Sequence, residues 1–336
     1  MWLMGSSEAL AVTDPLLRSG NEMKSITCRM LGRTGLSVSE IGLGGWQLQN
    51  PLWGTSRADD ARRVVHCALD AGCSFFDTAP GYADGRSEKV LGEALESVRS
   101  HVTICTKCGH DADGTSNFTP DAIRASLEAS LRRLQTDYVD ILLLHNPPME
   151  LMDGTRAPQY EALEHLKQEG KLRVYGVSLD HGRELETVAK TTRCGAVEVL
   201  FNVFHQEPLA AFPLARAAGI GLIVKVPLDS GWLSGKYRGD SQFRGVRERW
   251  SREVIERRAT LVEQFAALLP PGMPLAHAAL GFVLAHTEVS TVIPGAKTPK
   301  QAQDNFAAAG TTFPRELVRT IREFWERELK DDPLPW

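Results

Sequence analysis

The sequence predicts a closed (β/α)8 barrel, the TIM-barrel fold, with an N-terminal β-hairpin and two helices beyond the minimal unit. Eight short apolar runs alternate with amphipathic segments, and the runs lack the alternating polarity of half-exposed strands. The composition also stays uniform along all 336 residues, which favours one large domain over two. We therefore predict a single barrel domain over residues 28–336, preceded by a leader or disordered arm over residues 1–27.

The predicted elements follow one another in the order that a barrel requires. The hairpin pairs residues 29–31 with 36–38. The strands are predicted at residues 41–44, 74–77, 102–107, 139–145, 174–178, 197–201, 221–225 and 290–294. The helices between them are predicted at residues 59–71, 87–98, 119–134, 158–169, 183–191, 209–218 and 275–286. The additional helices are one at 253–268, after the long connection 229–250 that follows the seventh strand, and one at 314–329 at the C-terminus.

An open doubly wound sheet is the structural alternative to a closed barrel. That fold would carry a G-x-G-x-x-G fingerprint after its first strand, where the pyrophosphate of a dinucleotide binds. The corresponding segment here, Gly42-Leu-Gly44-Gly45-Trp46, does not match that fingerprint. The pattern therefore favours the barrel.

Charge and cysteine content exclude several functional classes. The 38 basic and 42 acidic residues give a net charge of −4, so no basic field indicates nucleic acid, and no apolar run is long enough for a membrane span. We expect a cytoplasmic protein acting on a small molecule, with neither nucleic acid nor a membrane as partner. Cys105 and Cys108 have CxxC spacing but no further ligands nearby, so we interpret them as reduced thiols and predict no metal site.

Polar side chains stand at the C-terminal ends of three consecutive predicted strands, where barrel enzymes assemble their active sites. Asp77 ends the second strand, Lys107 the third and His145 the fourth. Tyr82 lies in the loop that follows Asp77. Each residue alone could serve packing or an ordinary ion pair. Because all four stand at adjacent strand ends, we predict that they share one catalytic site.

These residue types suit the reduction of a carbonyl group. Hydride arriving at the carbonyl carbon leaves charge on oxygen, which a nearby acid must protonate. The ammonium of Lys107 would lower the pKa of Tyr82 from its ordinary value of about 10. Asp77 would hold Lys107 charged and in place, and a neutral His145 would donate a hydrogen bond to the substrate oxygen. Tyr82 is thus the predicted general acid or base.

The motifs around these residues resemble the aldo-keto reductase superfamily from about Arg29 to the C-terminus. FFDTAPGY at residues 75–82 is similar to the family's signature, and SEKVLG at 87–92 to the segment that normally follows it. Thr106-Lys107 and Leu144-His145 fit the other two catalytic positions, and KLRVYGVS at 171–178 resembles a further recurrent stretch. The resemblance implies an extended nicotinamide cofactor lying across the top of the barrel, without a Rossmann domain.

The resemblance also implies which residues hold the nicotinamide and the pyrophosphate. Glu198 stands where glutamine is common, and Lys225 stands where the family often places an aromatic side chain. Residues 226–236 look like the loop that closes over the pyrophosphate, with Lys236 neutralising the phosphates. The cofactor-binding residues implied here are Gly45, Trp46, Asp77, Ser178, Glu198, Lys225, Pro227, Leu228, Ser230 and Lys236.

Residues 293–305 are similar to the family's segment for the adenosine 2′-phosphate. A helix beginning near Pro299 would direct free N–H groups and its dipole at an anion. Lys297 would pair with the phosphate, and we predict NADP(H) as the preferred cofactor. Gln301, where many relatives carry arginine, keeps NAD(H) open. The implied contacts are Gly295, Ala296, Lys297, Gln301, Asp304 and Asn305.

The predicted substrate pocket consists of Trp46, Tyr82, His145 and Trp232, with Trp53, Met149 and Met152 on neighbouring loops. Such side chains favour an apolar or sugar-stacking pocket. We expect an NADP(H)-dependent oxidoreductase that reduces an aldehyde or ketone to the alcohol, or the reverse. Two alternatives stay open. One is an NAD(P)-dependent aldose or secondary-alcohol dehydrogenase, and the other is a redox-sensing auxiliary subunit with slow turnover, like those of potassium channels.

Overall fold

The computed structural model describes residues 26–53, 57–110, 115–155, 157–310 and 313–335, so most of the predicted arm lies outside the described residues. The chain begins with the predicted hairpin. Strands β1 (Cys28–Met30) and β2 (Ser37–Ser39) pair in antiparallel register. The turn between them needs glycine, because Gly32 and Gly35 both adopt positive φ angles, of 52° and 80°.

Eight parallel strands form the barrel, in sequence order and each paired with the next. They are β3 (Leu43–Gly44), β4 (Phe75–Asp77), β5 (Thr103–Cys108), β6 (Val139–His145), β7 (Leu172–Leu179), β8 (Ala196–Leu200), β9 (Gly221–Lys225) and β10 (Val289–Val292). The barrel closes through parallel bridges from Ile41 to Val292 and from Gly44 to Gly295. The predicted closed barrel is therefore confirmed, and the open sheet is excluded.

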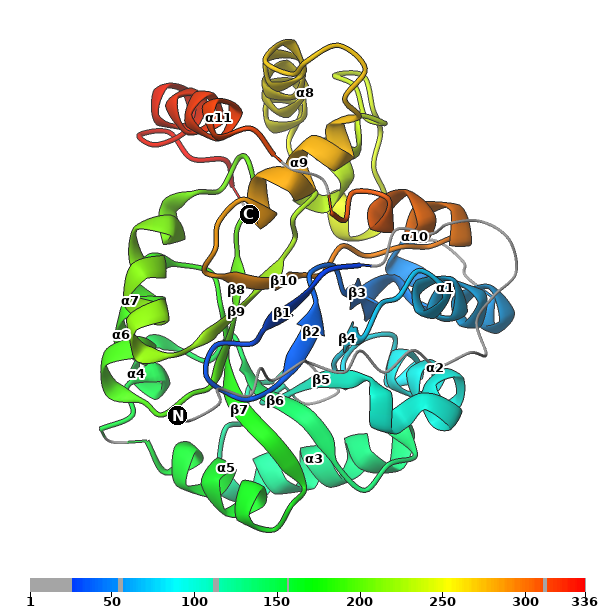
Figure 1. Ribbon diagram of the computed structural model, residues 1–336, viewed down its shortest axis with the longest axis vertical. Coiled ribbons are helices and arrows are strands. Elements are labelled where there is room, and N and C mark those ends of the chain that lie inside the picture. The colour runs from blue at the N-terminus through cyan, green and yellow to red at the C-terminus, as the bar shows by residue number, and fades with distance from the viewer. Residues whose placement is uncertain (1–25, 54–56, 111–114, 156, 311–312, 336) are drawn as a thin grey trace, which may run out of the picture.

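Helices surround the strands, as Figure 1 shows. The helices of the ring are α1 (Ala58–Asp70), α2 (Arg86–Leu95), α3 (Pro120–Leu134), α5 (Pro158–Gln168), α6 (Gly182–Thr191), α7 (Phe212–Ala218), α9 (Leu275–Leu284) and α10 (Pro299–Phe306). The predicted additional helices are α8 (Arg252–Ala267) and α11 (Arg315–Glu328), which lie at the periphery beside α9. A short helix α4 (Met149–Met152) was not predicted. Among the described residues, no helix is both long and apolar enough to cross a membrane.

Two predicted helices are divided in the structure. The predicted helix 87–98 is split into α2 and a 3-10 helix η3 (Glu96–His101). Residues 209–218 were expected to form a single helix, but a 3-10 helix η4 (Glu207–Ala211) precedes α7 there. Pro213 stands in the first turn of α7, where its missing N–H costs nothing. The same residue in the middle of a continuous helix would remove a backbone hydrogen bond, which explains the break.

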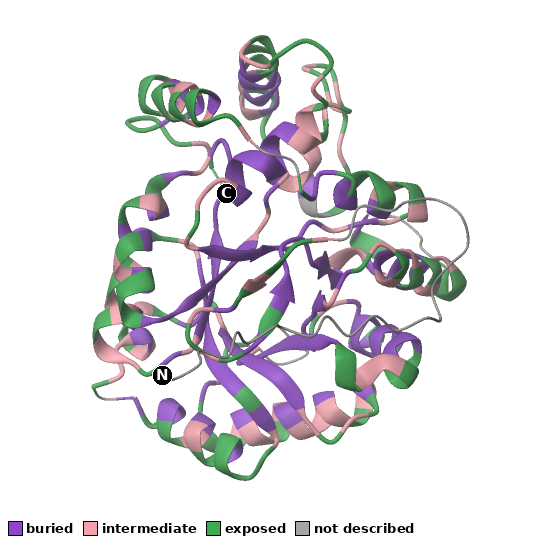
Figure 2. Cartoon of the chain, in the orientation of Figure 1, coloured by how far each residue is buried: buried purple, intermediate pink, exposed green. Residues whose placement is uncertain are grey.

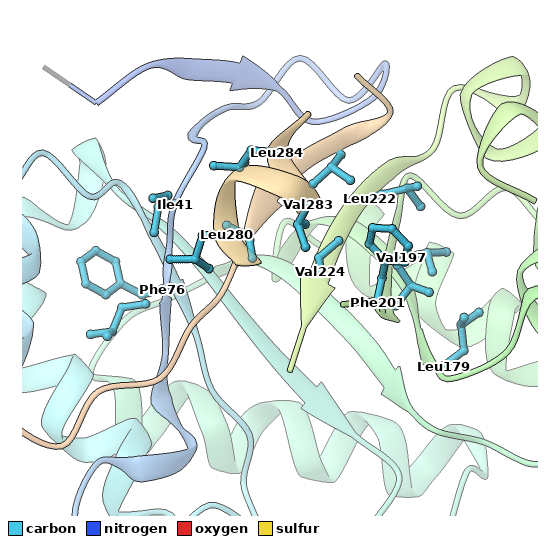
Figure 3. Packing of buried hydrophobic residues seen from close by; sticks show 14 of the residues in the cluster. Ile41, Phe76, Leu179, Val197, Phe201, Leu222, Val224, Leu280, Val283 and Leu284 are labelled. Carbon is cyan, nitrogen blue, oxygen red and sulfur yellow. The ribbon is translucent and has the colours of Figure 1, made fainter. Parts of the chain in front are cut away.

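Two apolar clusters hold the fold together. The larger one lies between the strands and the surrounding helices, and the strands are buried almost throughout (Figure 2). Figure 3 shows part of it, including Val224 of β9 and Leu280 and Val283 of α9. The smaller cluster joins Leu31 of the hairpin to inward-facing strand residues such as Phe75 and Ile223. Burial on both faces explains why the strands are apolar without alternation.

The hairpin closes one end of the barrel and leaves the other end for a site. Arg33 donates its backbone N–H to Gly219 O at 2.8 Å, just before β9, and Ser39 bonds to Ser74, just before β4. These contacts lie at the N-terminal ends of the strands. The opposite, C-terminal ends carry the polar residues.

Candidate active site

The predicted catalytic residues come together at the C-terminal ends of β4, β5 and β6. Asp77 is the last residue of β4, Lys107 the fifth of β5 and His145 the last of β6. Parallel pairing sets these strand ends side by side, with Asp77 opposite Cys105 and Lys107 opposite Leu143. The chemistry-bearing side chains therefore share one volume, as the strand-end rule requires.

Lys107 is fully buried between two carboxylates. Its Nζ lies 2.5 Å from Asp77 Oδ1 and 3.1 Å from Glu198 Oε2, and it donates a further hydrogen bond of 3.1 Å to Thr78 O. Burial alone would disfavour the ammonium, but the two carboxylates outweigh it and raise the pKa of Lys107 well above its usual range. The side chain is therefore a fixed positive charge.

Tyr82 forms one wall of the site together with Trp46 and His145. The ring of Tyr82 lies 6.1 Å from the ring of Trp46 and 6.1 Å from that of His145, centre to centre, and 5.2 Å from Lys107 Nζ. Burial, and then the charges of Lys107, Lys225 and His110, lower the pKa of His145 well below its usual value. His145 is therefore neutral, as predicted, and can donate a hydrogen bond without acting as a competing acid.

The pKa of Tyr82 departs from the prediction. Lys107 does lower it, but burial of the phenol raises it more, and the carboxylates of Asp77 and Glu198 add to the increase. The net pKa of Tyr82 is thus raised above 10, not lowered. Desolvation of the phenol and the second carboxylate, which both depend on the folded structure, therefore outweigh the ammonium.

Gly45 lies in the wall behind the site for a packing reason. A Cβ atom at this position would stand 2.6 Å from Asp77 O and 2.8 Å from the hydroxyl of Ser87. Only glycine allows the segment after β3 to approach the end of β4 this closely. Gly45 thereby sets the position of the next residue, Trp46, which lines the cleft.

A chain of hydrogen bonds connects β6, β7, β8 and β9 beneath the cleft. Lys225 Nζ donates to Ser178 Oγ and to Asn146 Oδ1, each at 2.9 Å, and pairs with Asp180 at 2.9 Å. Ser178 in turn donates to Glu198 Oε1 at 3.1 Å. Lys225 at the end of β9 is thus part of a polar network. The resemblance to the family had led us to expect an aromatic side chain at this position.

The loop after β9 forms the cleft wall in an unusual backbone conformation. Val226 and Ser230 have positive φ angles of 55° and 53°. Such angles are uncommon for residues other than glycine, and especially so for a β-branched residue such as Val226. Asn202 donates to Val226 O at 3.0 Å, and Arg247 donates two hydrogen bonds to Ser230 O, at 2.9 and 2.7 Å. These bonds hold a backbone that would otherwise relax.

Three cations converge at the far end of the cleft without a counter-ion. They are Lys236, Arg247 and Lys297, and no carboxylate lies within ion-pair distance of them in the part of the chain that the structure describes. Partial desolvation, and then the charges of Arg247 and Lys297, lower the pKa of Lys236 to about 8. Burial and Arg247 also lower the pKa of Lys297. Arg247 thus disfavours the charged form of both lysines.

The start of α10 completes that end. Thr298 caps the helix by accepting a hydrogen bond from Gln301 N–H, and Pro299 follows in the first turn, as predicted. Gln301 Oε1 accepts a 2.8 Å hydrogen bond from Lys297 N–H, and Asn305 donates to Gly295 O at 3.3 Å. Gln301 and Asn305, both predicted to contact the cofactor, thus hold the backbone of residues 295–297 by hydrogen bonds.

All these residues surround one cleft of about 1500 Å³. Predicted site residues that line it are Trp46, Asp77, Tyr82, His145, Glu198, Lys225, Pro227, Leu228, Ser230, Lys236, Gly295, Lys297, Gln301, Asp304 and Asn305. Predicted residues that lie behind its wall are Gly45, Lys107, Ser178 and Ala296. Trp53 also lines the cleft, whereas Met149 and Met152 do not.

The position of Trp232 differs from the prediction. It was predicted in the substrate pocket, but its side chain is fully buried and does not line the cleft. Its ring packs 5.5 Å from Tyr237, 5.7 Å from Phe243 and 6.1 Å from Trp250. Trp232 is therefore the centre of a small aromatic core that supports the loop after β9.

Some cleft residues were not assigned by the sequence analysis. Asn146 and Asp180 directly follow the ends of β6 and β7, so the strand-end rule could have found them. Arg247 lies in the long connection before α8 and stacks over the ring of Trp53, with its guanidinium 4.2 Å from the ring centre. No periodic pattern marks Arg247, because its position depends on how that connection folds.

Comparisons with known proteins agree with this geometry. The model of the aldo/keto reductase family matches residues 40–326. L-galactose dehydrogenase of Arabidopsis thaliana is 33% identical over 297 residues, which cover 85% of this chain and 89% of that protein. NADH-specific methylglyoxal reductase of Escherichia coli (strain K12) is 30% identical over 324 residues, covering 87% and 98%. A probable voltage-gated potassium channel subunit beta of Arabidopsis thaliana is 30% identical over 306 residues, covering 83% and 89%.

A solved structure gives the same result. The holo form of aldo-keto reductase AKR11C1 from Bacillus halodurans superposes with a TM-score of 0.76 at 28% identity, covering 89% of this chain and 96% of that one. The fold and these similarities define an oxidoreductase built on a (β/α)8 barrel. The chain belongs to the aldo/keto reductase family, whose members use nicotinamide cofactors.

Proposed function

We propose that this protein is an NADP(H)-dependent oxidoreductase that interconverts an aldehyde or ketone and the corresponding alcohol, with Tyr82 as the general acid or base. The observation that carries the proposal is the buried charge group beside Tyr82, in which Lys107 Nζ lies 2.5 Å from Asp77 and 3.1 Å from Glu198. The fixed ammonium next to the phenol offsets part of the energy that burial and the carboxylates add to the tyrosinate, at a site that faces a large cleft.

The cleft suits a dinucleotide. Its volume of about 1500 Å³ exceeds the roughly 300–1,000 Å³ of ordinary small-ligand pockets, which leaves room for a cofactor and a small substrate together. The uncompensated cations Lys236, Arg247 and Lys297 are the groups that an anionic ligand would neutralise. Lys297 at the start of α10 is the residue that supports NADP(H) over NAD(H), because a 2′-phosphate needs a cation and N–H donors at that place.

The roles of this chain's residues follow from their charges. The cofactor supplies or accepts the hydride. Tyr82 transfers a proton to the oxygen of the substrate, and even a phenol with a raised pKa can do so because an alkoxide is a much stronger base. Lys107 stabilises the tyrosinate that remains, and Asp77 keeps Lys107 in place. Neutral His145 orients the substrate oxygen by donating a hydrogen bond, and Trp46 covers the reacting groups on one side.

The same residues serve the opposite direction, with the tyrosinate as base. The similarity to L-galactose dehydrogenase favours a polyhydroxylated substrate as the second candidate. The polar groups Asn146, Asp180 and Lys225 at the cleft support it, because buried hydroxyl groups of a sugar need such partners.

A two-part experiment tests the proposal. Quenching of tryptophan fluorescence, with Trp46 and Trp53 in the cleft as reporters, measures the Kd values of NADPH and NADH. Steady-state assays then pair each reduced cofactor with aldehydes and ketones, and each oxidised cofactor with aldoses and secondary alcohols. We expect NADPH to bind at least about tenfold more tightly than NADH, and turnover above roughly one per second for one substrate class.

Two results would overturn parts of the proposal. If NADH bound more tightly than NADPH, the three cations Lys236, Arg247 and Lys297 would not serve a 2′-phosphate. The protein would then share the cofactor preference of its NADH-specific relative. Tight binding of NADPH with turnover far below one per second for every substrate would favour a redox-sensing subunit, like the channel-subunit relative.

A further inference from the structure

A second group of chemically reactive side chains lies beside the cleft. His181 directly precedes α6. His205 lies in the connection from β8 to η4, and Glu207 is the first residue of η4, which packs against α6. A possible metal-ligand atom of each residue lies within 4.8 Å of the other two. Nδ1 of His181 is 4.0 Å from Oε2 of Glu207. Two imidazoles and a carboxylate are thus gathered at one point of the surface.

Backbone hydrogen bonds hold two of the three side chains in place. Nε2 of His205 lies 3.2 Å from the carbonyl oxygen of Asp180, and because a carbonyl only accepts, Nε2 carries the proton. Nδ1 of His205 therefore keeps its lone pair. Glu207 Oε2 accepts a 2.8 Å hydrogen bond from Gly182 N–H. Imidazoles that bind metals commonly donate their second N–H to a carbonyl in this way.

We propose that His181, His205 and Glu207 form a binding site for a divalent cation of the zinc class, with water completing the coordination. Two nitrogen ligands disfavour Mg²⁺ and Ca²⁺, which prefer oxygen, and suit Zn²⁺, Co²⁺, Ni²⁺ and Cu²⁺. Ligand atoms around zinc lie about 3.3 Å apart, given bonds of about 2.0 Å. The side chains of His181 and Glu207 are 62% and 52% exposed, so a small rotation of each, which would lengthen the hydrogen bond from Gly182 N–H to Glu207, would bring their ligand atoms to this spacing.

Asp180 connects this site to the cleft. Its carbonyl accepts the hydrogen bond from His205, while its carboxylate pairs with Lys225 at 2.9 Å and accepts a 3.0 Å hydrogen bond from Asn146. Both of these partners line the cleft. A cation bound to His205 would therefore fix the segment that positions Lys225, and would do so without entering the cleft.

The test measures Zn²⁺ binding to the full-length protein by competition with a chromophoric chelator. Cys28 is exposed, so all proteins carry Cys28→Ser to remove an accessible thiol. We expect one equivalent of Zn²⁺ to bind. His181→Ala and Glu207→Gln, which change exposed side chains, are each expected to weaken binding at least about tenfold, with circular dichroism and the melting temperature checking that the fold is kept. His165→Ala, an exposed histidine on α5, is the matched control and should bind like the parent.

Co²⁺ substitution identifies the ligands. A cobalt complex of imidazole and carboxylate shows visible d–d absorption without an intense sulfur-to-metal charge-transfer band. Three results would overturn the site: no saturable Zn²⁺ binding, unchanged affinity in both ligand variants, or a charge-transfer band that places the metal on cysteine. None of these measurements depends on enzymatic turnover, so the site stands or falls independently of the proposed function.

Discussion

The two ends of the cleft differ in how their cations are compensated. At the strand-end site, Lys107 has two carboxylate partners, at 2.5 and 3.1 Å, and Lys225 has Asp180 at 2.9 Å. At the other end, Lys236 and Lys297 lie near Arg247 with no carboxylate within ion-pair distance among the described residues. Buried paired charges are held in fixed positions by the protein itself. Unpaired cations of like sign raise the energy of the empty site and leave their neutralisation to a ligand.

This difference separates chemistry from recognition. The compensated end fixes the protonation states of Tyr82, Lys107 and His145, so changes there should alter rates and pH profiles. The uncompensated end attracts an anion, so changes there should alter cofactor affinity and leave the chemical step intact. If the two ends are independent in this way, a substitution at one end should leave the property governed by the other end unchanged.

The largest effect is expected from Tyr82→Phe. Removing the phenolic oxygen eliminates the proton donor, which should lower kcat by about 10³ to 10⁴-fold. The aromatic ring and its contacts with Trp46 and His145 are retained. Steady-state kinetics should therefore show the loss, while fluorescence titration gives an NADPH Kd within about twofold of the parent. Activity close to the parent would reject Tyr82 as the acid.

Lys297→Met should produce the next largest effect, at the opposite end. A charge-assisted hydrogen bond contributes about 1.5–3 kcal/mol, so the Kd of NADPH should rise roughly 10- to 100-fold while that of NADH changes much less. Lys300→Met is the matched control, because Lys300 is exposed on α10 and pairs with Asp304 on its own helix. Equal losses for the two cofactors would show that Lys297 does not distinguish them.

Glu198→Gln tests the second carboxylate on Lys107. Burial raises the pKa of Tyr82 and Lys107 opposes this, while the negative charges of Asp77 and Glu198 raise it further. Neutralising Glu198 should therefore lower the pKa of Tyr82. The pH profiles of alcohol oxidation and of carbonyl reduction should both move to lower pH, by about one unit. Ser178→Ala removes a hydrogen-bond partner of Glu198 without changing charge, and should leave both profiles in place.

The sequence predicted the compensated end well because its residues stand at strand ends. An apolar run followed by Asp77, Lys107 or His145 identifies both the strand and the end at which it stops. Parallel strand order then brings these residues together without further information. Glu198 was also located correctly, but its contact with Lys107 depends on the barrel's curvature, which a linear pattern does not contain.

The uncompensated end was harder to predict because the long connection after β9 supplies much of it. Trp232 was predicted to lie at the rim of the substrate pocket, yet it packs with Phe243 and Trp250 in a separate small core. The same packing brings Arg247 to the cleft, where it bonds to Ser230 O. Irregular loops with a core of their own carry no helical or strand period, so neither the burial of Trp232 nor the role of Arg247 was visible.

The smallest predicted effect is a pH dependence of cofactor affinity that belongs to the uncompensated end alone. The pKa of Lys236 is about 8, because partial desolvation and the neighbouring cations oppose its charge. An anionic cofactor binds the protonated amine, so above that pH binding must be accompanied by proton uptake. The Kd of NADPH should therefore rise between pH 7 and pH 9, by at most about tenfold. The 2′-phosphate, with a second pKa of about 6, is mostly dianionic at pH 7, and its remaining ionisation would tighten binding, opposite to the predicted change.

Lys236→Gln should abolish this pH dependence and raise the Kd of NADPH at pH 7. Glu198→Gln, which acts at the compensated end, should leave the dependence unchanged. Fluorescence titrations at several pH values distinguish the two. A pH dependence that persists in Lys236→Gln but disappears in Lys297→Gln would transfer the titrating role to Lys297, whose pKa is also lowered by burial and by Arg247. If Glu198→Gln alone abolished it, the two ends of the cleft would be electrostatically coupled, and the separation between chemistry and recognition would fail.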